Sequence, residues 1–235
     1  MLELSPDVIR WIFGAVIILV LSICVHEWGH AVMADKLGDP TPRGQGRVSL
    51  NPFRHADPIG TFVFPLIALV LTRGGSLGFG WGKPVQVQPY KFTRRFSMRT
   101  GHMFVALAGP AMNVVLGLTI AIVHVLLLKY EVIPAEFGNS PIPTTMNEVL
   151  LYAVLLNFIL FFFNLIPAPP LDGGAVVEGL LPSKWVPNYQ RFAVYGPFIL
   201  MAVIFVPGLA RVFVGPAYWC RDGLYQGLIQ LFGVG

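Results

Sequence analysis

The feature that most constrains this chain is an apolar run, Ile17 to Ala34, that carries His26-Glu27-Trp28-Gly29-His30. A run of this hydropathy is typical of a membrane helix, in which a charged side chain costs about 2.5 to 3.5 kcal/mol near mid-bilayer on insertion scales. Ionisable groups in such a helix therefore mark a functional site by default. On a helix, His26 and His30 stand one turn apart on one face, with Glu27 beside them.

Two histidines at this spacing can bind one zinc ion, and the adjacent glutamate can serve as a general base, as in zinc metalloproteases. The alternative is a pair of packed histidines without a metal. That alternative leaves a polar cluster unpartnered in the segment that must insert into the bilayer. The metal interpretation predicts a third ligand elsewhere in the chain.

Composition favours a membrane protein, because 55% of the residues are hydrophobic and only 12% are charged, against about 25% charge in a soluble domain. The net charge of +4 does not indicate a nucleic-acid partner, since the Lys and Arg residues lie in loops between apolar runs and act as orientation signals. The two cysteines, Cys24 and Cys220, do not suggest a disulfide framework. Cys24 is expected to pack on the face opposite His26.

The apolar runs predict about four full transmembrane helices, at 11–34, 101–128, from 148 to about 164, and 192–214. The run 58–72 is too short for a comfortable span and holds Pro65 at its centre. We expect Asp57 to cap it, with Pro58 at its first helical position. The tail, 215–235, is interpreted as an interfacial helix. Short β-strands are predicted in the loops, near 47–50 and at 83–88, where Val85 and Val87 alternate with glutamines.

The third apolar span ends in a run that cannot continue as an ordinary helix, Pro167-Ala168-Pro169-Pro170-Leu171-Asp172. Irregular backbone at membrane depth is tolerated only inside protein or beside a wet cavity. Asp172 is therefore the natural third metal ligand, although it could instead cap a helix that begins at Gly173. Two other polar residues stay ambiguous. For Asn113, a hydrogen bond between helices is favoured over a role in the chemistry. For His55, a local structural role is favoured over a catalytic one.

One geometric demand sets the topology. The two histidines lie toward the end of the first span and Asp172 lies past the end of the third, so both spans must run in the same direction. The segment 58–72 must then be re-entrant or partial. Charge places the basic loops 35–57 and 73–100 on the cytoplasmic side, with the N-terminus and loop 129–147 outside.

Together these motifs resemble the site-2 protease family of intramembrane metalloproteases, in its small bacterial type without a PDZ domain. The resemblance rests on His-Glu-x-x-His at 26–30, Gly109-Pro110-x-x-Asn113, and Asn164, Pro167 and Leu171-Asp172-Gly173, in this order. It covers about residues 16 to 180. It implies one zinc ion per chain held by His26, His30 and Asp172, with Glu27 as catalytic acid and base. It also implies Asn164 as a donor to the oxyanion, unless that residue only ties down the proline-broken backbone.

The expected fold class is thus an all-α polytopic membrane protein, formed by one domain over 1–235 with a core at about 11–180 and C-terminal helices at 192–235. The expected function is zinc-dependent hydrolysis of peptide bonds within or near transmembrane segments of other proteins, in the cell membrane, with the lipid bilayer as surroundings. A substrate helix must first be unwound, and we expect a strand within 43–50 or 83–88 to hold it by edge pairing. The alternative function is a non-proteolytic membrane scaffold or metal-handling protein that uses the same ligands. Hydropathy argues against a soluble zinc protease. The sequence does not indicate an oligomeric state.

Overall fold

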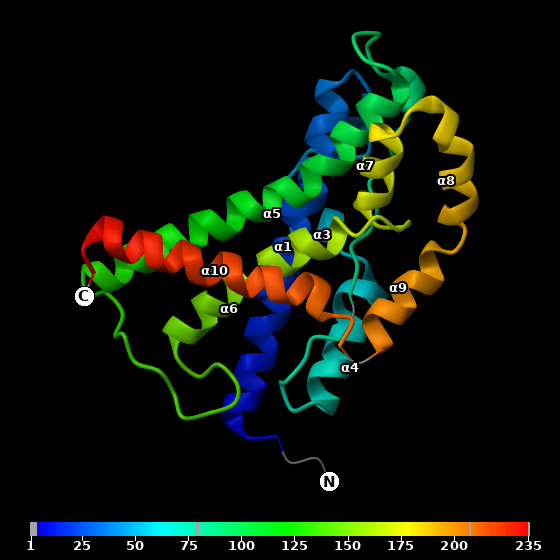
Figure 1. Ribbon diagram of the computed structural model, residues 1–235. Helices are drawn as coiled ribbons and strands as arrows, with labels where there is room; N and C mark the ends of the chain where they lie inside the picture. Colours follow the sequence, from blue (N-terminus) through cyan, green and yellow to red (C-terminus); the bar gives the residue numbers. More distant parts are fainter. Residues whose placement is uncertain (1–3, 79, 207, 235) are drawn as a thin grey trace.

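The computed structural model describes residues 4–78, 80–206 and 208–234, and α-helices dominate them. Two long helices, α1 (Pro6–Lys36) and α5 (Met98–Lys129), pack against each other through the centre of the molecule (Figure 1). Helix α5 also contacts α6 (Met146–Asn164), α7 (Asp172–Leu180) and α10 (Arg211–Phe232). It is therefore the element around which the others are placed.

Each long helix begins at a residue that the sequence specifies. Ser5 caps α1 by accepting from the backbone N–H of Val8, and Ser97 caps α5 by accepting from Thr100. Helix α6 begins with a capping box formed by Thr145 and Glu148. Such caps satisfy backbone N–H groups that lack a partner within the helix. The register of the side chains along each helix is fixed from these starting points.

Within the described residues, α1, α5 and α6 are the helices long and apolar enough to cross a membrane. The membrane-type helical fold is thus confirmed, but the predicted fourth span at 192–214 is not a single helix. That stretch is divided between the end of α8 (Val186–Ala193), α9 (Gly196–Phe205) and the first residues of α10. Pro197 cannot extend the helix that precedes it, and Gly208, at φ +90°, turns the chain after α9.

The segment predicted to be partial is a short helix in two parts. A π-helical portion, η1 (Pro58–Val63), continues into α4 (Phe64–Leu71). Asp57 caps it by accepting from the backbone N–H of Ile59 and Gly60, which confirms the predicted start. The fourteen residues from Pro58 to Leu71 rise about 21 Å, which is less than the hydrocarbon thickness of about 30 Å.

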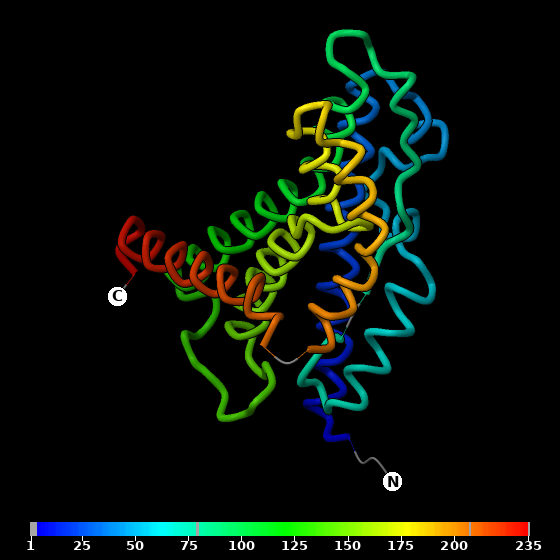
Figure 2. Tube along the Cα trace, turned by 45° about the vertical axis from the view of Figure 1, so that its right-hand side comes forward, coloured from blue at the N-terminus to red at the C-terminus, as the bar shows by residue number. Residues whose placement is uncertain are grey.

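The chain then returns along α1. Trp11 donates from Nε1 to the carbonyl of Gly74 over 2.8 Å, and the backbone N–H of Gln88 donates to Asp39 Oδ2 over 2.6 Å. These contacts place Gly74 near the start of α1 and Gln88 beyond its end. Figure 2 shows the chain after α4 running back along the length of α1. From Trp11 to Lys36 the helix rises about 38 Å, and fourteen residues reach at most about 50 Å. The described residues of this stretch, 74–78 and 80–88, named the return segment below, are therefore largely extended.

The predicted short strands are absent from the described residues. The one β-bridge there joins Ala56 to Gly82, and residues 83–88 have no strand partner. The alternating pattern of 83–88 correctly predicts an extended conformation, but a β-strand also requires a neighbouring segment to pair with. The other predicted strand, near 47–50, is irregular chain between two short helices, α2 (Thr41–Gly44) and α3 (Pro52–His55).

The return segment also changes the prediction for loop 73–100. Only its second part lies beside loop 35–57, since Thr93 donates to the carbonyl of Leu37 and Lys91 Nζ to Thr41 Oγ1. Its first part lies at the opposite end of α1, where Gly74 meets Trp11.

The short helices η2 and η3 occupy Pro89–Lys91 and Ser183–Trp185. A core of buried side chains joins α5, α6 and α10: Ala121, Val125, Val154, Leu155, Phe158, Ala217, Tyr225 and Leu228.

Candidate metal centre

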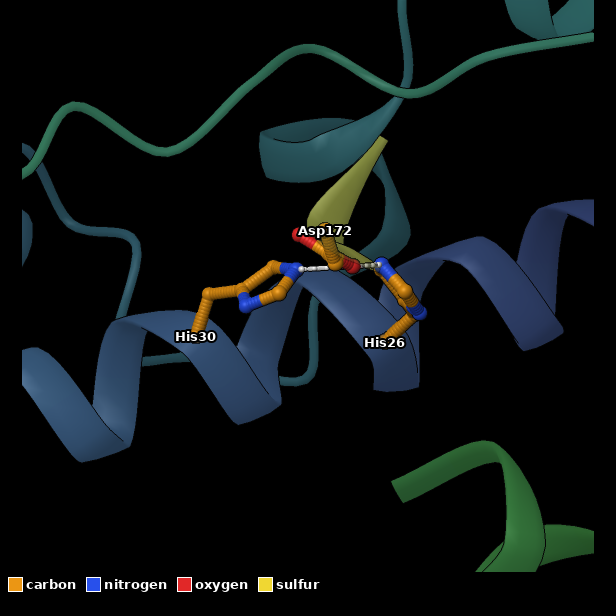
Figure 3. A group of neighbouring side chains, drawn as sticks. All are labelled: His26, His30 and Asp172. Atoms are coloured by element: carbon orange, nitrogen blue, oxygen red, sulfur yellow. Dashed lines mark hydrogen bonds and ion pairs between the residues drawn. The ribbon is translucent and has the colours of Figure 1, made fainter. Parts of the chain in front are cut away.

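Three predicted ligands converge at one point. His26 and His30 project from neighbouring turns of α1, and Asp172 reaches them from the first residue of α7 (Figure 3). Asp172 Oδ2 lies 3.2 Å from Nε2 of His26 and 3.3 Å from Nε2 of His30. The two Nε2 atoms are 3.0 Å apart. Both imidazoles are buried, with 8% of each histidine exposed.

The partners of the Nδ1 atoms decide which ring nitrogen carries the proton. His30 Nδ1 lies 2.7 Å from the carbonyl oxygen of Val105, which can only accept, so Nδ1 must donate. His26 Nδ1 lies 2.7 Å from Asn113 Oδ1, also an acceptor. In each neutral ring, Nε2 therefore carries a lone pair that points toward the other ring and toward Asp172.

Three acceptors facing one another at 3.0–3.3 Å require a positive charge between them. A proton on one nitrogen could not satisfy all three, and Asp172 Oδ2 is buried without a hydrogen-bond donor among the described residues. Zinc bonds of about 2.0–2.1 Å in a tetrahedral site separate the ligand atoms by about 3.3 Å. The nitrogen and carboxylate donors and their spacing fit a zinc ion.

Two glycines let α5 approach the histidine helix closely. A Cβ on Gly109 would lie 2.3 Å from Nε2 of His30 and 2.8 Å from Nε2 of His26. A Cβ on Gly29 would lie 2.6 Å from the carbonyl oxygen of Ala108. Any larger residue at Gly109 would push the imidazoles out of place, which explains the small residue in Gly109-Pro110 beside the site.

The position of Asp172 depends on the bend before α7. A Cβ on Gly173 would lie 2.4 Å from the carbonyl oxygens of Leu165 and Ile166, so α7 begins flush against the end of α6. From α8, the Tyr189 hydroxyl lies 3.0 Å from the carbonyl oxygen of Gly174 and 3.2 Å from that of Pro167. The hydroxyl thus bridges the two sides of the bend that carries Asp172.

A cavity of about 630 Å³ opens beside the three groups and is also lined by Glu27 and Asn164. The return segment forms one wall through Gly80 to Val87, and a Cβ on Gly82 would lie 3.3 Å from Cγ of Glu27. Asn164 Nδ2 donates to the carbonyl of Leu160, one turn earlier in α6, over 2.8 Å. Asn164 therefore faces the cavity while bonded to its own helix.

His55 and Cys24 do not join the three groups. His55 is fully buried, and its Nε2 donates to the carbonyl of Ser49 over 2.7 Å. Burial lowers the pKa of His55 below its ordinary value, and nearby Arg47 lowers it further, against the effect of the bond to Ser49. Cys24 Sγ lies 3.4 Å from the carbonyl oxygen of Leu50, on the packing face expected for it.

The site also contains residues that the sequence did not assign to it. Asn113 was predicted as interhelical glue, yet its amide oxygen contacts His26. A polar residue in an apolar helix was the signal, but the spacing of residues does not show which neighbour it meets. Val105 had no such signal, because it acts through its backbone carbonyl. Asn157 of α6 hydrogen-bonds to Asn113, but as one polar residue in a long apolar helix it carries no sequence signal that links it to the site.

Comparison with known proteins agrees with this site. The family model of peptidase family M50 matches residues 14–206. YwhC of Bacillus subtilis, named as a zinc metalloprotease, is 36% identical over 204 residues, which cover 86% of this chain and 84% of the relative. Rip2 of Mycolicibacterium smegmatis, also named as a zinc metalloprotease, is 29% identical over 225 residues, which cover 93% of this chain and 79% of the relative.

Zinc metalloprotease MJ0392 of Methanocaldococcus jannaschii is 30% identical over 176 residues, or 74% of this chain and 37% of the relative. No solved structure matches the chain significantly. The match to the family model, over residues 14–206, includes the positions of His26, Glu27, His30 and Asp172. The resemblance found in the motifs is confirmed, and the chain belongs to peptidase family M50.

Proposed function

We propose that this chain is an intramembrane zinc metalloprotease that cleaves membrane-protein substrates within or near their transmembrane segments. The observation that carries the proposal is the convergence of three lone-pair donors, His26, His30 and Asp172, beside Glu27 in a cavity among membrane-type helices. Membership of peptidase family M50 and the zinc metalloprotease names of the relatives support the protease and the metal. One zinc ion per chain matches the single group of three ligands found among the described residues.

The protein groups would divide the reaction among them. His26, His30 and Asp172 would hold the ion, which when bound polarises a carbonyl oxygen and lowers the pKa of water to about 7. Glu27 would take a proton from the attacking water on its carboxylate and deliver that proton to the departing amide nitrogen. Asn164 would turn an amide N–H toward the carbonyl oxygen of the scissile bond as negative charge develops there.

The substrate must be extended before its peptide bonds become accessible, because a helix hides them in its own hydrogen bonds. The return segment offers an edge for this purpose. Val85 and Val87 line the cavity, and among the described residues their backbone groups have no hydrogen-bond partner. A substrate strand could pair there by main-chain hydrogen bonds. The other expected strand, within 43–50, is less suitable because part of it is helical.

We expect Val85→Pro to reduce cleavage by more than tenfold, since proline removes an N–H and disturbs the edge, while zinc content stays unchanged. Val85→Ala is the matched control, because it keeps the N–H. Equal turnover by Val85→Pro and Val85→Ala would discard edge pairing and leave the protease proposal in place.

We propose that the protein lies in the cell membrane, with the end of the molecule where α1 finishes facing the cytoplasm. That end gathers most of the basic loop residues, including Lys36, Arg43, Lys91 and Arg99, whereas Arg73 follows α4 near the start of α1. Basic residues favour the cytoplasmic side. Cysteine labelling of Arg43→Cys and Arg73→Cys in intact cells and in lysed cells measures which end is exposed.

The deciding experiment compares wild type with Glu27→Gln. Both are purified in detergent, and zinc content and cleavage of a panel of single-span membrane proteins are measured on the same samples. One zinc per chain in both, with cleavage by wild type only, supports the proposal. If both hold zinc and neither cleaves any substrate, the scaffold or metal-handling function is favoured, because those functions need the ligands but not the base.

A further inference from the structure

Two asparagines, Asn113 of α5 and Asn157 of α6, form a buried hydrogen-bond chain that ends at His26. Asn113 Nδ2 donates to Asn157 Oδ1 over 3.0 Å and to the backbone carbonyl of Ser22 over 3.2 Å. Asn157 Nδ2 donates to Ser22 Oγ over 3.0 Å and to the carbonyl of Ala153 over 2.9 Å. Both asparagines are completely buried. These hydrogen bonds therefore join α1, α5 and α6 at the level of the candidate metal centre.

The carbonyls of Ser22 and Ala153 can only accept, and so they fix the direction of these hydrogen bonds. If the amide of Asn157 were flipped, its oxygen would face the carbonyl of Ala153, and its nitrogen would face the nitrogen of Asn113. A flipped Asn113 would likewise set its oxygen against two acceptors. Buried polar groups without a partner are strongly disfavoured. Asn113 Oδ1 must therefore face His26, and His26 must donate from Nδ1.

We infer that Asn157 is a positioning residue of the metal centre, which acts on His26 only through Asn113. Together with the carbonyl of Ser22, it holds Asn113 Oδ1 toward His26, which keeps the proton of His26 on Nδ1 and leaves Nε2 free to bind a metal ion. The inference about metal rests on the proposed function, whereas the inference about the proton rests on hydrogen bonds alone. His30 needs no such device, because a backbone carbonyl already fixes its proton.

The position of Asn157 on its helix gives this relay a second connection to the site. Leu160 and Asn164, which line the cavity, lie three and seven residues after Asn157 and so share its face of α6. One face of α6 thus orients a metal ligand and forms a wall of the cavity. A rotation of α6 would disturb both at once.

The test uses the full chain in detergent with four variants, Asn113→Leu, Asn157→Leu, the double variant and Asn147→Leu. Asn147→Leu is the matched control, since Asn147 is a buried asparagine of the same helix that contacts another histidine, His124, through Oδ1 over 2.7 Å. Zinc affinity is measured by chelator competition with zinc ions alone. The proton of His26 is located by ¹⁵N NMR of histidine-labelled, metal-free protein, in spectra recorded across a pH series so that the neutral rings are identified by the measurement itself.

We expect Asn113→Leu to weaken zinc binding by about 10- to 100-fold, the usual effect of removing a partner of a ligand. Asn157→Leu should weaken it by about threefold to tenfold and give His26 a mixture of the two tautomers, whereas Asn147→Leu should match wild type. The double variant should bind zinc no more weakly than Asn113→Leu, because Asn157 acts only through Asn113.

Two results would overturn the relay. One is Asn157→Leu behaving like Asn147→Leu in both affinity and tautomer. The other is a double variant whose loss is the product of the two single losses, which would mean that the asparagines act independently. A wild-type chain that binds no zinc but shows the expected tautomers would contradict the proposed function and support the hydrogen-bond relay.

Discussion

Replacing Gly109 by alanine should separate metal binding from stability. The added Cβ would lie 2.3 Å from Nε2 and Cε1 of His30 and 2.8 Å from Nε2 of His26. Ordinary contacts between such atoms are about 3.5–4.0 Å, so the His30 ring must withdraw by about 1 Å. Distances between a metal and its ligands tolerate only about 0.2 Å. The geometry of the site cannot absorb this change.

The two consequences differ in size. Loss of the His30 bond should lower zinc affinity by at least about 100-fold, or about 2.7 kcal/mol. For the fold, alanine in place of glycine within a helix gains about 0.5–1 kcal/mol, while overpacking costs about 1–3 kcal/mol. The net cost to the stability of the fold is therefore between about zero and about 2.5 kcal/mol. Metal-free Gly109→Ala should therefore unfold near the temperature of the metal-free wild type while it binds zinc poorly.

Gly117→Ala is the matched control on the same helix, because its Cβ would meet Asn157 Cβ at an ordinary 3.5 Å. Zinc affinity is measured by chelator competition and unfolding by a thermal scan of the metal-free forms in detergent. Zinc affinity in Gly109→Ala within threefold of that in Gly117→Ala would refute the steric argument. It would show that α5 can move away from α1 without cost.

Two further predictions concern the surroundings of the site. Tyr189→Phe removes the hydroxyl that bridges the carbonyls of Pro167 and Gly174, at a cost of about 0.5–1.5 kcal/mol. It should speed chelator-driven zinc release several-fold through Asp172, whereas Tyr195→Phe, at an exposed tyrosine, should not. Equal release rates would contradict the bridge. Burial lowers the pKa of His55, so its contribution to stability is complete above the ordinary pKa of about 6.5 and is lost as pH falls through the lower folded value. The free energy of unfolding of the metal-free forms should fall below about pH 6.5, so their unfolding temperature should drop, and His55→Gln should flatten that pH dependence; an unchanged pH dependence would locate the effect elsewhere.

The three groups that converge could be predicted because local chemistry specifies them. His26 and His30 follow from helical spacing, and Asp172 follows from prolines that forbid a helix at membrane depth. Asp57 as a cap follows from the proline after it. Each of these inferences needs only neighbours in the sequence.

The features of the fold and the site that could not be predicted depend on how separate helices are oriented against one another. The contact of Asn113 with His26 requires the orientation of α5 on α1, and the role of Val105 requires knowledge of a backbone atom. The part of the return segment at 83–88 could be predicted as extended, but the position of the segment along α1 could not, because its anchors Trp11 and Asp39 are far away in sequence. The predicted fourth span failed because hydropathy averages over the breaks at Pro197 and Gly208.

The return segment has a consequence for how the protein is assembled. Helices α1, α5 and α6 are apolar enough to enter a bilayer individually. An extended chain cannot do so, since its backbone groups would meet lipid without partners. The return segment can reach membrane depth only after α1 is present to shelter it. Biogenesis of this protein must therefore proceed in two stages, with the wall of the cavity installed in the second.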